Sequence, residues 1–388
     1  MEKLFYKDVH ITEFNGTVTS CTKEEKGFFI TLDQTAFFPE EGGQIADKGS
    51  IADFPVKDVI IKDDIIYHLL DTPLTVGSVV KGCVDFAQRF DFMQQHTGEH
   101  IISGLVHEEY QYDNVGFHLD NHIVTLDFNG VLNLDQLRSI ENKANEIIWA
   151  QIPVNAWFPD PKLLSTMPYR SKKAIPGDIR IVEIPGVDIC ACCAPHVDNT
   201  AEIGIIKITD VMNHRGGVRV TIVCGGRALK DYTKKQDNAT AISVLLSSKT
   251  DEIPTAVNRL FSEKQLLKEQ NNALQANLLS LKIAQVNGPV KGANPCLFVE
   301  DMDGIAIRNG VNELCKKYED YCGIFSGNDT NGYRFVIGSA KRDCKKLLEK
   351  LKEHNAKGGG SSLMIQGTIS APEEEITVFF SSNIFQEE

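Results

Sequence analysis

Short apolar runs separated by turn-forming residues fill the first part of the chain. Three of these runs lie at residues 27–38, 61–70 and 76–86, and a glycine-containing turn follows the first of them at 39–44. Runs of this length that are rich in Val, Ile and Phe and bounded by Gly, Pro or Asp are typical of β-strands. The pattern predicts that residues 1–88 form a small antiparallel β-barrel or open sheet.

From Arg89 onward the apolar residues follow a helical spacing. Residues 90–110 predict one helix, and residues 134–151 predict a second helix that begins after Asn133. Apolar runs between and after these helices predict β-strands. Together they predict an α+β domain over residues 89–232. Its strands are expected at residues 122–128, 179–184, 203–208 and 218–225.

The stretch from residue 233 to residue 287 carries the most regular pattern in the chain. Mostly apolar residues recur there at alternating steps of four and three, which is the heptad pattern of a coiled coil. Lys264 and Asn271 are the polar residues within this apolar seam. The pattern fits a helical hairpin that packs on its own chain equally as well as a dimer. An Asn-Gly-Pro sequence at 287–289 is expected to end the helix. The repeat comprises Ile253, Val257, Leu260, Lys264, Leu267, Asn271, Leu274, Leu278 and Leu281.

Residues 288–388 return to mixed patterns, which predict a C-terminal α/β module. The whole chain is thus predicted to be an α+β protein of four parts: a small N-terminal β-barrel, an α+β domain, a helical coiled-coil segment and the module. The module is expected to contain a strand at 295–300, a hairpin over 327–338, a basic helix over 341–357, glycines at 358–360 and a closing strand at 377–380.

Length and composition describe a soluble globular protein. The 388 residues exceed what one core usually supports, so two or three domains are expected, and 42% of the residues are apolar. No apolar run reaches the roughly 18 residues of a membrane span, and the first residues lack the apolar core of a signal peptide. Ten cysteines are scattered along the chain, with three crowded at Cys190, Cys192 and Cys193, which favours reduced thiols with a metal or catalytic role. These features predict a cytoplasmic protein without a membrane anchor.

The charge balance leaves the partner open. A formal net charge of -13 argues at first against nucleic acid, because phosphate binding depends on Lys and Arg. Two basic stretches stand out against this average, one over residues 170–180 and the other over 341–357. Such stretches are often only solvated helix faces, so neither decides the question. The first stretch contains Arg170, Lys172, Lys173 and Arg180.

Two histidines stand four residues apart in the first predicted helix. This spacing places the imidazoles of His96 and His100 on one face, where they can hold a single zinc ion. Cys192 and His196 repeat the spacing, but Pro195 lies between them and favours a turn over a helix. A thiol and an imidazole in a cysteine-rich turn strengthen the metal interpretation. The remaining candidates lack such a partner and are interpreted as structural or peripheral: His107, His118, His122 and His214.

The segment from His96 to His100 also satisfies the His-x-x-Glu-His pattern of inverted zinc peptidases, in which Glu99 would be the general base. Such enzymes need a further carboxylate ligand on a downstream helix. Here the downstream candidates are instead a sulfur and a nitrogen on a turn. Only three positions of the pattern are fixed, so a zinc peptidase is kept as an alternative.

Beyond these single motifs, the sequence resembles the editing domain of alanyl-tRNA synthetase and its free-standing relatives, the AlaX proteins of the long type. The resemblance extends over nearly the whole chain. Its last hundred residues resemble the module that follows a coiled coil in the synthetase and in the long AlaX class. Four ordered motifs carry the resemblance: LDQTAFFPEEGGQIADKG (32–49), QHTGEHIISG (95–104), VGFHLDNHIVTLDF (115–128) and CCAPHV (192–197).

Two departures from the family pattern bear on the site. Glu99 stands where the AlaX relatives more often carry a neutral residue, which places a charge beside the metal. Residues 193–195, Cys-Ala-Pro, replace the Gly-Gly-Thr of the synthetase, so the contacts of that loop do not carry over. No synthetase activation domain is recognised in the first ninety residues, which implies a protein that does not charge tRNA.

The resemblance implies a zinc-dependent hydrolase that acts in trans on mischarged tRNA(Ala), with serine as the first candidate for removal and glycine as the second. A hydrolytic site can recognise the serine hydroxyl that alanine lacks if a buried polar group pairs with it. The implied partner is tRNA, bound by the basic helix and the C-terminal module, and the coiled coil and module also permit a homodimer. A non-catalytic, zinc-stabilised RNA-binding protein is the second alternative.

The same resemblance assigns roles to ten residues. The expected metal ligands are His96, His100, Cys192 and His196. The expected catalytic residues are Gln44, Thr97 and Glu99, and Glu99 would act as a base or orient a ligand. The expected substrate contacts are Thr35, Gly42 and Gly43, because glycines let the backbone approach the aminoacylated end closely. The candidates for the serine hydroxyl are Thr35, Gln44 and Thr97, each of which could equally be a turn or cap residue.

Overall fold

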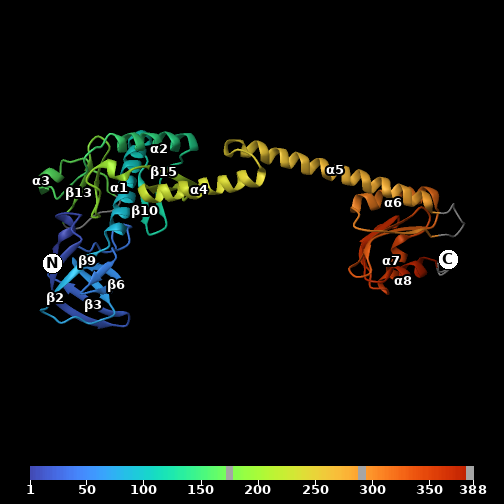
Figure 1. The fold of residues 1–388 in the computed structure, drawn as a ribbon, viewed down its shortest axis with the longest axis horizontal. Coiled ribbons are helices and arrows are strands. Elements are labelled where there is room, and N and C mark those ends of the chain that lie inside the picture. Colours follow the sequence, from blue (N-terminus) through green and yellow to red (C-terminus); the bar gives the residue numbers. More distant parts are fainter. Residues whose placement is uncertain (172–177, 287–293, 382–388) are drawn as a thin grey trace. The chain divides into compact units, whose positions relative to one another are not determined.

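The computed structural model describes residues 1–171, 178–286 and 294–381 (Figure 1). Within these residues the chain is a mixed α and β structure, which confirms the predicted class at that level. It divides into two compact units, Met1–Asn238 and Ala239–Glu388. No helix of the described part is long and apolar enough to cross a membrane.

The first unit opens with a strongly curled sheet of seven strands. These are β2 (Glu13–Glu24), β3 (Gly27–Leu32), β5 (Gly49–Ile51), β6 (Phe54–Val56), β7 (Asp58–Lys62), β8 (Ile65–Leu70) and β9 (Val79–Val84). They pair in the order β6-β5-β9-β2-β3-β8-β7, antiparallel throughout. Strand β6 also lies against β8, so the sheet nearly closes around a core that contains the fully buried Phe37 and Phe38.

Helix α1 (Phe86–Tyr110) follows this sheet and is the element that positions the site. Its first turn is capped by Asp85, whose carboxylate accepts hydrogen bonds from the amides of Ala87 and Gln88. The cap makes the helix begin four residues before the predicted start at residue 90. Its middle turns are continuously buried from Gln95 to Val106, because strands and a second helix surround them.

A second sheet and a smaller one complete the first unit around α1. Helix α2 (Leu134–Trp149) begins at the predicted Asn133, which forms a capping box with Gln136. The larger sheet has the antiparallel order β10 (Asn114–Leu119), β11 (Val124–Phe128), β16 (Gly217–Cys224) and β15 (Ile206–His214). The smaller sheet has the order β12 (Asn155–Trp157), β13 (Ile181–Ile184) and β14 (Asp188–Ala191). Helix α1 packs against α2, β14 and β16, so its buried face reaches both sheets.

The second unit begins inside helix α4 (Gly225–Leu246) and continues with the long helix α5 (Ile253–Gln285). Its sheet has the order β17 (Cys296–Val299), β18 (Tyr321–Asn328), β19 (Gly332–Ser339), β21 (Met364–Ile369) and β20 (Lys357–Gly360). Its shorter helices are α6 (Gly304–Lys317), α7 (Cys344–Lys352) and α8 (Glu373–Ser381). The predicted first strand, hairpin and basic helix of the module correspond to β17, β18–β19 and α7.

One sequence prediction is wrong in structural detail. The closing strand predicted at 377–380 lies within helix α8, because Ile376 and Phe380 are buried one turn apart while Val378 is exposed. The basic stretch over 170–180 is not a surface patch where it is described. Arg180 is buried and Arg170 is largely buried, each bound to an acceptor inside the first unit.

The predicted domain limits at residues 88, 232 and 287 stay predictions. Helix α4 runs through residue 232 without a break. The expected helix end at 287–289 lies outside the described residues.

Candidate metal centre

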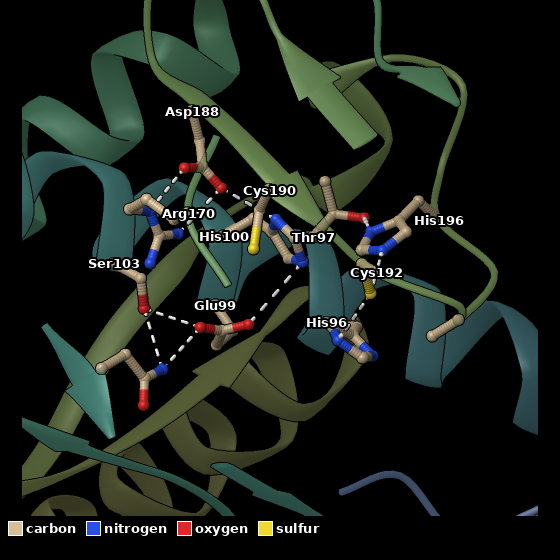
Figure 2. Close-up of polar contacts among 12 residues, drawn as sticks. His96, Thr97, Glu99, His100, Ser103, Arg170, Asp188, Cys190, Cys192 and His196 are labelled. Atoms are coloured by element: carbon tan, nitrogen blue, oxygen red, sulfur yellow. Dashed lines mark hydrogen bonds and ion pairs between the residues drawn. The ribbon is translucent and has the colours of Figure 1, made fainter. Parts of the chain in front are cut away.

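Two distant segments bring four metal-binding side chains together in the first unit. His96 and His100 lie one turn apart on α1, while Cys192 and His196 lie on the irregular segment after β14. Their ligand atoms all lie within 4.8 Å of one another (Figure 2). The Cys192 Sγ is 3.5 Å from His96 Nε2 and 3.3 Å from His196 Nε2. The four expected metal ligands therefore share one place in the fold.

Two imidazole rings of this cluster are held from their outer nitrogens by oxygen acceptors. His96 Nδ1 lies 2.8 Å from Gln44 Oε1, and His100 Nδ1 lies 2.9 Å from Asp188 Oδ2. Amide and carboxylate oxygens only accept hydrogen bonds, so both Nδ1 atoms carry the proton. The Nε2 lone pairs are then left facing the cluster, which is the form of histidine that binds a metal ion.

Thr97 connects α1 to the segment that carries the other two ligands. Its Oγ1 lies 3.1 Å from His196 Nδ1 and accepts a hydrogen bond of 3.3 Å from the Val197 amide. Thr97 and Gln44, both expected at the catalytic site, thus contact ligand imidazoles from outside the cluster. Their hydroxyl and amide fix the rings of His196 and His96.

Asp188 extends this outer layer of contacts into a buried ion pair. Arg170 donates to its Oδ1 at 2.7 Å from Nε and to its Oδ2 at 2.9 Å from Nη2. Burial by itself raises the pKa of Asp188, but the contacts with His100 and Arg170 outweigh it and hold that pKa below its usual value. Burial likewise lowers the pKa of His100, yet Asp188 and Cys192 raise it to about 9, so an ion that binds its Nε2 would displace a proton from that atom. The carboxylate of Asp188 is therefore charged when it binds the ring.

The chemistry of the four donors fits a bound metal ion. Burial raises the pKa of the Cys192 thiol, but the imidazoles of His96 and His196 more than offset this and lower it well below its usual value. The thiolate is the form that binds metals. All three imidazoles are buried, and three imidazole nitrogens with one thiolate suit a tetrahedral ion such as zinc.

The backbone conformation of the glycine-rich turn brings this turn close to the cluster of expected ligands. Gly42 and Gly43 have φ angles of +66° and +88°, which side chains rarely allow. A Cβ on Gly43 would lie 2.4 Å from the Phe117 carbonyl oxygen, and the Gly43 carbonyl accepts a hydrogen bond from the Leu119 amide. This contact with β10 delivers the next residue, Gln44, to His96. A Cβ on Gly42 would lie 3.4 Å from the Cys193 sulfur, so the turn also contacts the second ligand segment.

Glu99 lies beside the metal ligands on the buried face of α1. Its Oε1 accepts hydrogen bonds of 2.6 Å from Ser103 Oγ and from Asn114 Nδ2. Its Oε2 lies 3.9 Å from His100 Nε2 (Figure 2). The carboxylate is thus fixed by two donors and directed at a nitrogen of His100, which suits an orienting contact.

Comparisons with known proteins identify the family of the chain. Residues 179–221 match the sequence model of the family described as threonyl and alanyl tRNA synthetase second additional domain, and residues 2–88 match that of class II (A) tRNA synthetases. The chain is 28% identical to the alanyl-tRNA editing protein AlaX-L of Pyrococcus horikoshii, over 97% of this chain and 96% of that protein. It is 30% identical to the alanyl-tRNA editing protein Aarsd1 of Mus musculus, over 95% of this chain and 94% of that protein. The chain belongs to the alanyl-tRNA editing proteins.

Membership of the alanyl-tRNA editing proteins confirms the resemblance seen in the four motifs. The alanine–tRNA ligase of Methanococcus maripaludis is also similar, at 29% identity over 97% of this chain, but the match covers 43% of that ligase. The match of residues 2–88 to class II synthetases falls on the stretch that forms the seven-stranded sheet.

Thr35 is an expected substrate contact of this editing protein. Its hydrogen bonds join it to the N-terminal sheet and not to the four expected metal ligands. Its side chain is fully buried in the N-terminal sheet, with Oγ1 2.9 Å from His68 Nε2 and 3.1 Å from the Phe37 amide. His68 Nδ1 donates to the Ile30 carbonyl, so its Nε2 accepts the threonine proton. The Thr35 hydroxyl is therefore oriented by the sheet.

Sequence reasoning missed the residues that hold the ligands from behind. Asp188, Cys190 and Cys192 alternate along and just beyond β14, and a strand period of two places alternate side chains on one face. This alternation is the signal that would have found Asp188. Arg180 donates from Nη1 to the carbonyls of Cys192 and Ala194, at 3.2 and 2.8 Å, and fixes the shape of the ligand loop. Nothing in the sequence distinguishes Arg180 from a surface arginine.

Proposed function

We propose that this protein is a trans-acting deacylase that hydrolyses the ester bond between tRNA(Ala) and a wrongly attached amino acid. Its membership of the alanyl-tRNA editing proteins makes it a hydrolase of aminoacyl-tRNA esters. The observation that carries the proposal is the buried group of three imidazoles and one thiol, with oxygen partners behind each ring. The alignment covers most of each editing relative but less than half of the ligase, which fits action on tRNA charged elsewhere.

Zinc is the proposed ion, held by His96, His100, Cys192 and His196. Zinc at such a site supplies charge that polarises an ester carbonyl or lowers the pKa of a bound water to about 7. The chain's own residues set the geometry around it, because oxygen partners on every Nδ1 keep the Nε2 atoms directed inward.

Glu99 is the proposed residue for proton transfer. One of its oxygens is fixed by Ser103 and Asn114, while the other lies near His100. A carboxylate in this position can accept a proton from water beside the ester, or it can only keep His100 in place. Glu99→Gln separates the two roles. Lost hydrolysis with full zinc content supports the base, whereas lost zinc supports the orienting role.

Serine is the proposed amino acid that the site removes, and Gln44 is the proposed residue that recognises it. The Gln44 carbonyl oxygen already accepts from His96, which leaves its amide nitrogen to donate to a serine hydroxyl. Alanine would leave that donor unpaired at a cost of roughly 1–3 kcal/mol, which corresponds to about 5- to 150-fold discrimination. Thr35 and Thr97 are the other candidates, and Gly42 and Gly43 would admit the aminoacylated end.

The tRNA body is proposed to bind the second unit, with α7 as the main basic element. Part of the charge of the basic stretch just before α7 is neutralised locally, since Lys341 pairs with Glu319 and Arg342 pairs with Asp320. The exposed Lys345 on α7 is then the residue best placed to meet phosphate. We also propose that two copies of the chain associate through the second unit, including its helix α5.

The deciding experiment is a deacylation assay on purified tRNA(Ala) charged with serine, glycine or alanine. We expect serine to be released fastest, and His100→Ala to lose both zinc and activity. His107→Ala is the matched control, because His107 lies on the same helix with an exposed side chain bound to Asp113. This control should keep wild-type zinc content and rate.

Two results would replace the proposal. A folded, zinc-loaded wild-type protein that binds tRNA without releasing any amino acid would identify a non-catalytic RNA-binding protein. Cleavage of peptides in place of aminoacyl-tRNA would identify a zinc peptidase.

A further inference from the structure

The residues around the cluster of expected metal ligands differ in their exposure. Thr97 and Asp188, which contact ligand imidazoles from behind, are both buried (Figure 2). The glycine-rich turn also comes close to the cluster, yet its residues Gly42 and Gly43 are exposed. The accessible surface next to the cluster therefore includes this turn, and we expect a substrate to approach along it.

Phe117 is an aromatic side chain that lies between this turn and a metal ligand. It belongs to β10, and its ring centroid is 4.6 Å from that of His96, with the two rings tilted by 46°. A Cβ on Gly43 would lie 3.1 Å from Phe117 Cδ1, so the phenyl ring also packs against the turn. Phe117 is only partly buried, whereas His96 is 1% exposed. The phenyl ring therefore covers the imidazole and still presents part of its surface to a molecule that reaches the cluster.

We propose that Phe117 sets the upper size limit for the amino acid that this site removes. Its ring excludes side chains with a second substituent on Cβ, such as threonine and valine, and admits serine and glycine. This role rests on the proposed deacylase activity and adds a specificity-determining residue to it. Gln44 is proposed to recognise the serine hydroxyl, and Phe117 rejects additional bulk next to that hydroxyl.

Gln44 and Phe117 contact the same imidazole, which places the two proposed specificity residues side by side. Gln44 Oε1 lies 2.8 Å from His96 Nδ1, while Phe117 packs against the ring of His96. A serine whose hydroxyl accepts from the Gln44 amide has its Cβ one bond away from that oxygen, and so close to the imidazole that Phe117 covers. The methyl group that distinguishes threonine from serine is attached to this Cβ, where it would collide with the phenyl ring.

The surroundings of Phe117 leave its ring little room to move aside. Its backbone pairs with Leu126 of the neighbouring strand β11, inside the four-stranded sheet. The ring itself lies against His96 and the glycine-rich turn. In a site of this kind one additional carbon atom typically changes the rate about 10- to 200-fold. We therefore expect the wild-type protein to release threonine at least about tenfold more slowly than serine.

A size limit is useful to an enzyme that acts in trans, because most amino acids on other charged tRNAs are larger than serine. Glycine, alanine and serine all lie below the limit, so Phe117 does not distinguish among these three. That distinction stays with Gln44, which donates to a hydroxyl that only serine carries. The two residues thus act on different parts of the substrate, and their effects can be measured separately.

Deacylation of tRNA(Ala) charged with threonine or with serine tests the size limit in the full-length protein. Phe117→Ala should release threonine at a rate within about threefold of serine, because the wall is removed. Phe117→Leu keeps an apolar side chain against His96 and should give an intermediate ratio of the two rates. Val115→Ala is the matched control, because Val115 lies on the same strand with 62% of its surface exposed. This control should keep the wild-type preference for serine.

Zinc content, measured on the same samples, separates a size limit from a purely structural role. Faster release of threonine by either Phe117 variant, with zinc retained, supports the size limit. An unchanged ratio of threonine to serine release in both variants, or loss of zinc from both, would overturn it and leave Phe117 as a support for His96. A wild type that releases serine and threonine equally fast would refute the size limit alone, whereas a wild type that releases no amino acid would refute the deacylase itself.

Discussion

At the scale of single residues, the ring of His100 is held by charged contacts rather than by its helix alone. Asp188 accepts from His100 Nδ1 at 2.9 Å and binds Arg170 through both of its oxygens. These groups are buried or nearly so, and water screens their charges little. A ligand that is already oriented in this way loses little freedom when it binds an ion, so the ion pair should add to metal affinity.

Asp188→Asn tests this contribution. Asparagine keeps the size of the side chain but loses the charge that Arg170 matches, and we expect metal affinity to fall about 10- to 100-fold. Competition against a coloured chelator measures this, with Asp198→Asn as the control, because the exposed carboxylate of Asp198 lies close in sequence to His196 and contacts the exposed His10. Equal affinity in Asp188→Asn and the wild type would contradict the role.

The burial of His68 leads us to expect a specific dependence of the free energy of unfolding on pH. Burial lowers the pKa of His68 from 6.5 to about 4 in the folded protein. The unfolded chain therefore binds a proton that the folded chain excludes, and stability falls as pH drops from about 6.5 to about 4, by roughly 3 kcal/mol in all. Urea unfolding at several pH values should show this slope in the wild type and a slope smaller by about one proton in His68→Gln. His118→Gln, an exposed histidine, should keep the slope; an undiminished slope in His68→Gln would assign it to other groups.

The grouping of the four expected ligands could be predicted from the sequence because their spacings carry the chemistry. His96 and His100 follow the helix period, and Cys192 and His196 stand in a cysteine-rich turn. Asp188 and Arg170 could not be found in the same way, since an ion pair between residues 18 apart depends on how two segments meet in space. Thr35 was predicted near the substrate from its motif alone, and its contact with His68 depends on the register of the sheet.

At the scale of elements, the hydrophobic pattern predicted long helices well and short apolar runs poorly. Helix α2 could be predicted from its period and its cap at Asn133, and α5 from its heptad period. The short Thr-Val-Phe-Phe run at 377–380 fits a strand or a helix equally, and Ile376 and Phe380 are buried one turn apart in helix α8. The glycine-rich turn was recognised by its motif, but its packing on β10 follows only from the fold.

Gly43 makes that packing testable. Its φ of +88° and the 2.4 Å between an added Cβ and the Phe117 carbonyl oxygen mean that Gly43→Ala must shift the turn. We expect a loss of roughly 2–4 kcal/mol in the free energy of unfolding, together with weaker metal binding, because Gln44 moves with the turn. Gly77→Ala is the matched control, since Gly77 has a φ of +87° and nothing within 4 Å of its added Cβ. It should lose only about 1 kcal/mol and bind metal normally; equal effects in the two variants would contradict the contact with Phe117.

At the scale of the whole molecule, the four ligands and the oxygen partners behind them all belong to the first unit, Met1–Asn238. The basic helix α7 belongs to the second unit. The sequence pattern placed a domain limit near residue 232, whereas the unit boundary falls at residue 238, because α4 runs across both positions without a break. The division into two units separates the proposed chemistry from the proposed tRNA surface, and the two functions should respond separately to truncation.

Deletion of residues 236–388 should therefore weaken tRNA binding and leave some hydrolysis. We expect zinc content to be unchanged and tRNA affinity to fall by about tenfold or more, with a smaller dependence on salt, because phosphate contacts are lost. Filter binding at several salt concentrations and single-turnover deacylation at high enzyme concentration measure the two effects.

The full-length variant Leu267→Glu separates two causes of weaker tRNA binding. If this variant binds tRNA as weakly as the truncated chain, the association of two copies through α5 carries the affinity. If it binds tRNA like the wild type, the second unit itself carries the affinity. Full retention of affinity after the deletion would refute the proposed tRNA surface and leave the first unit as the binding site for the whole tRNA.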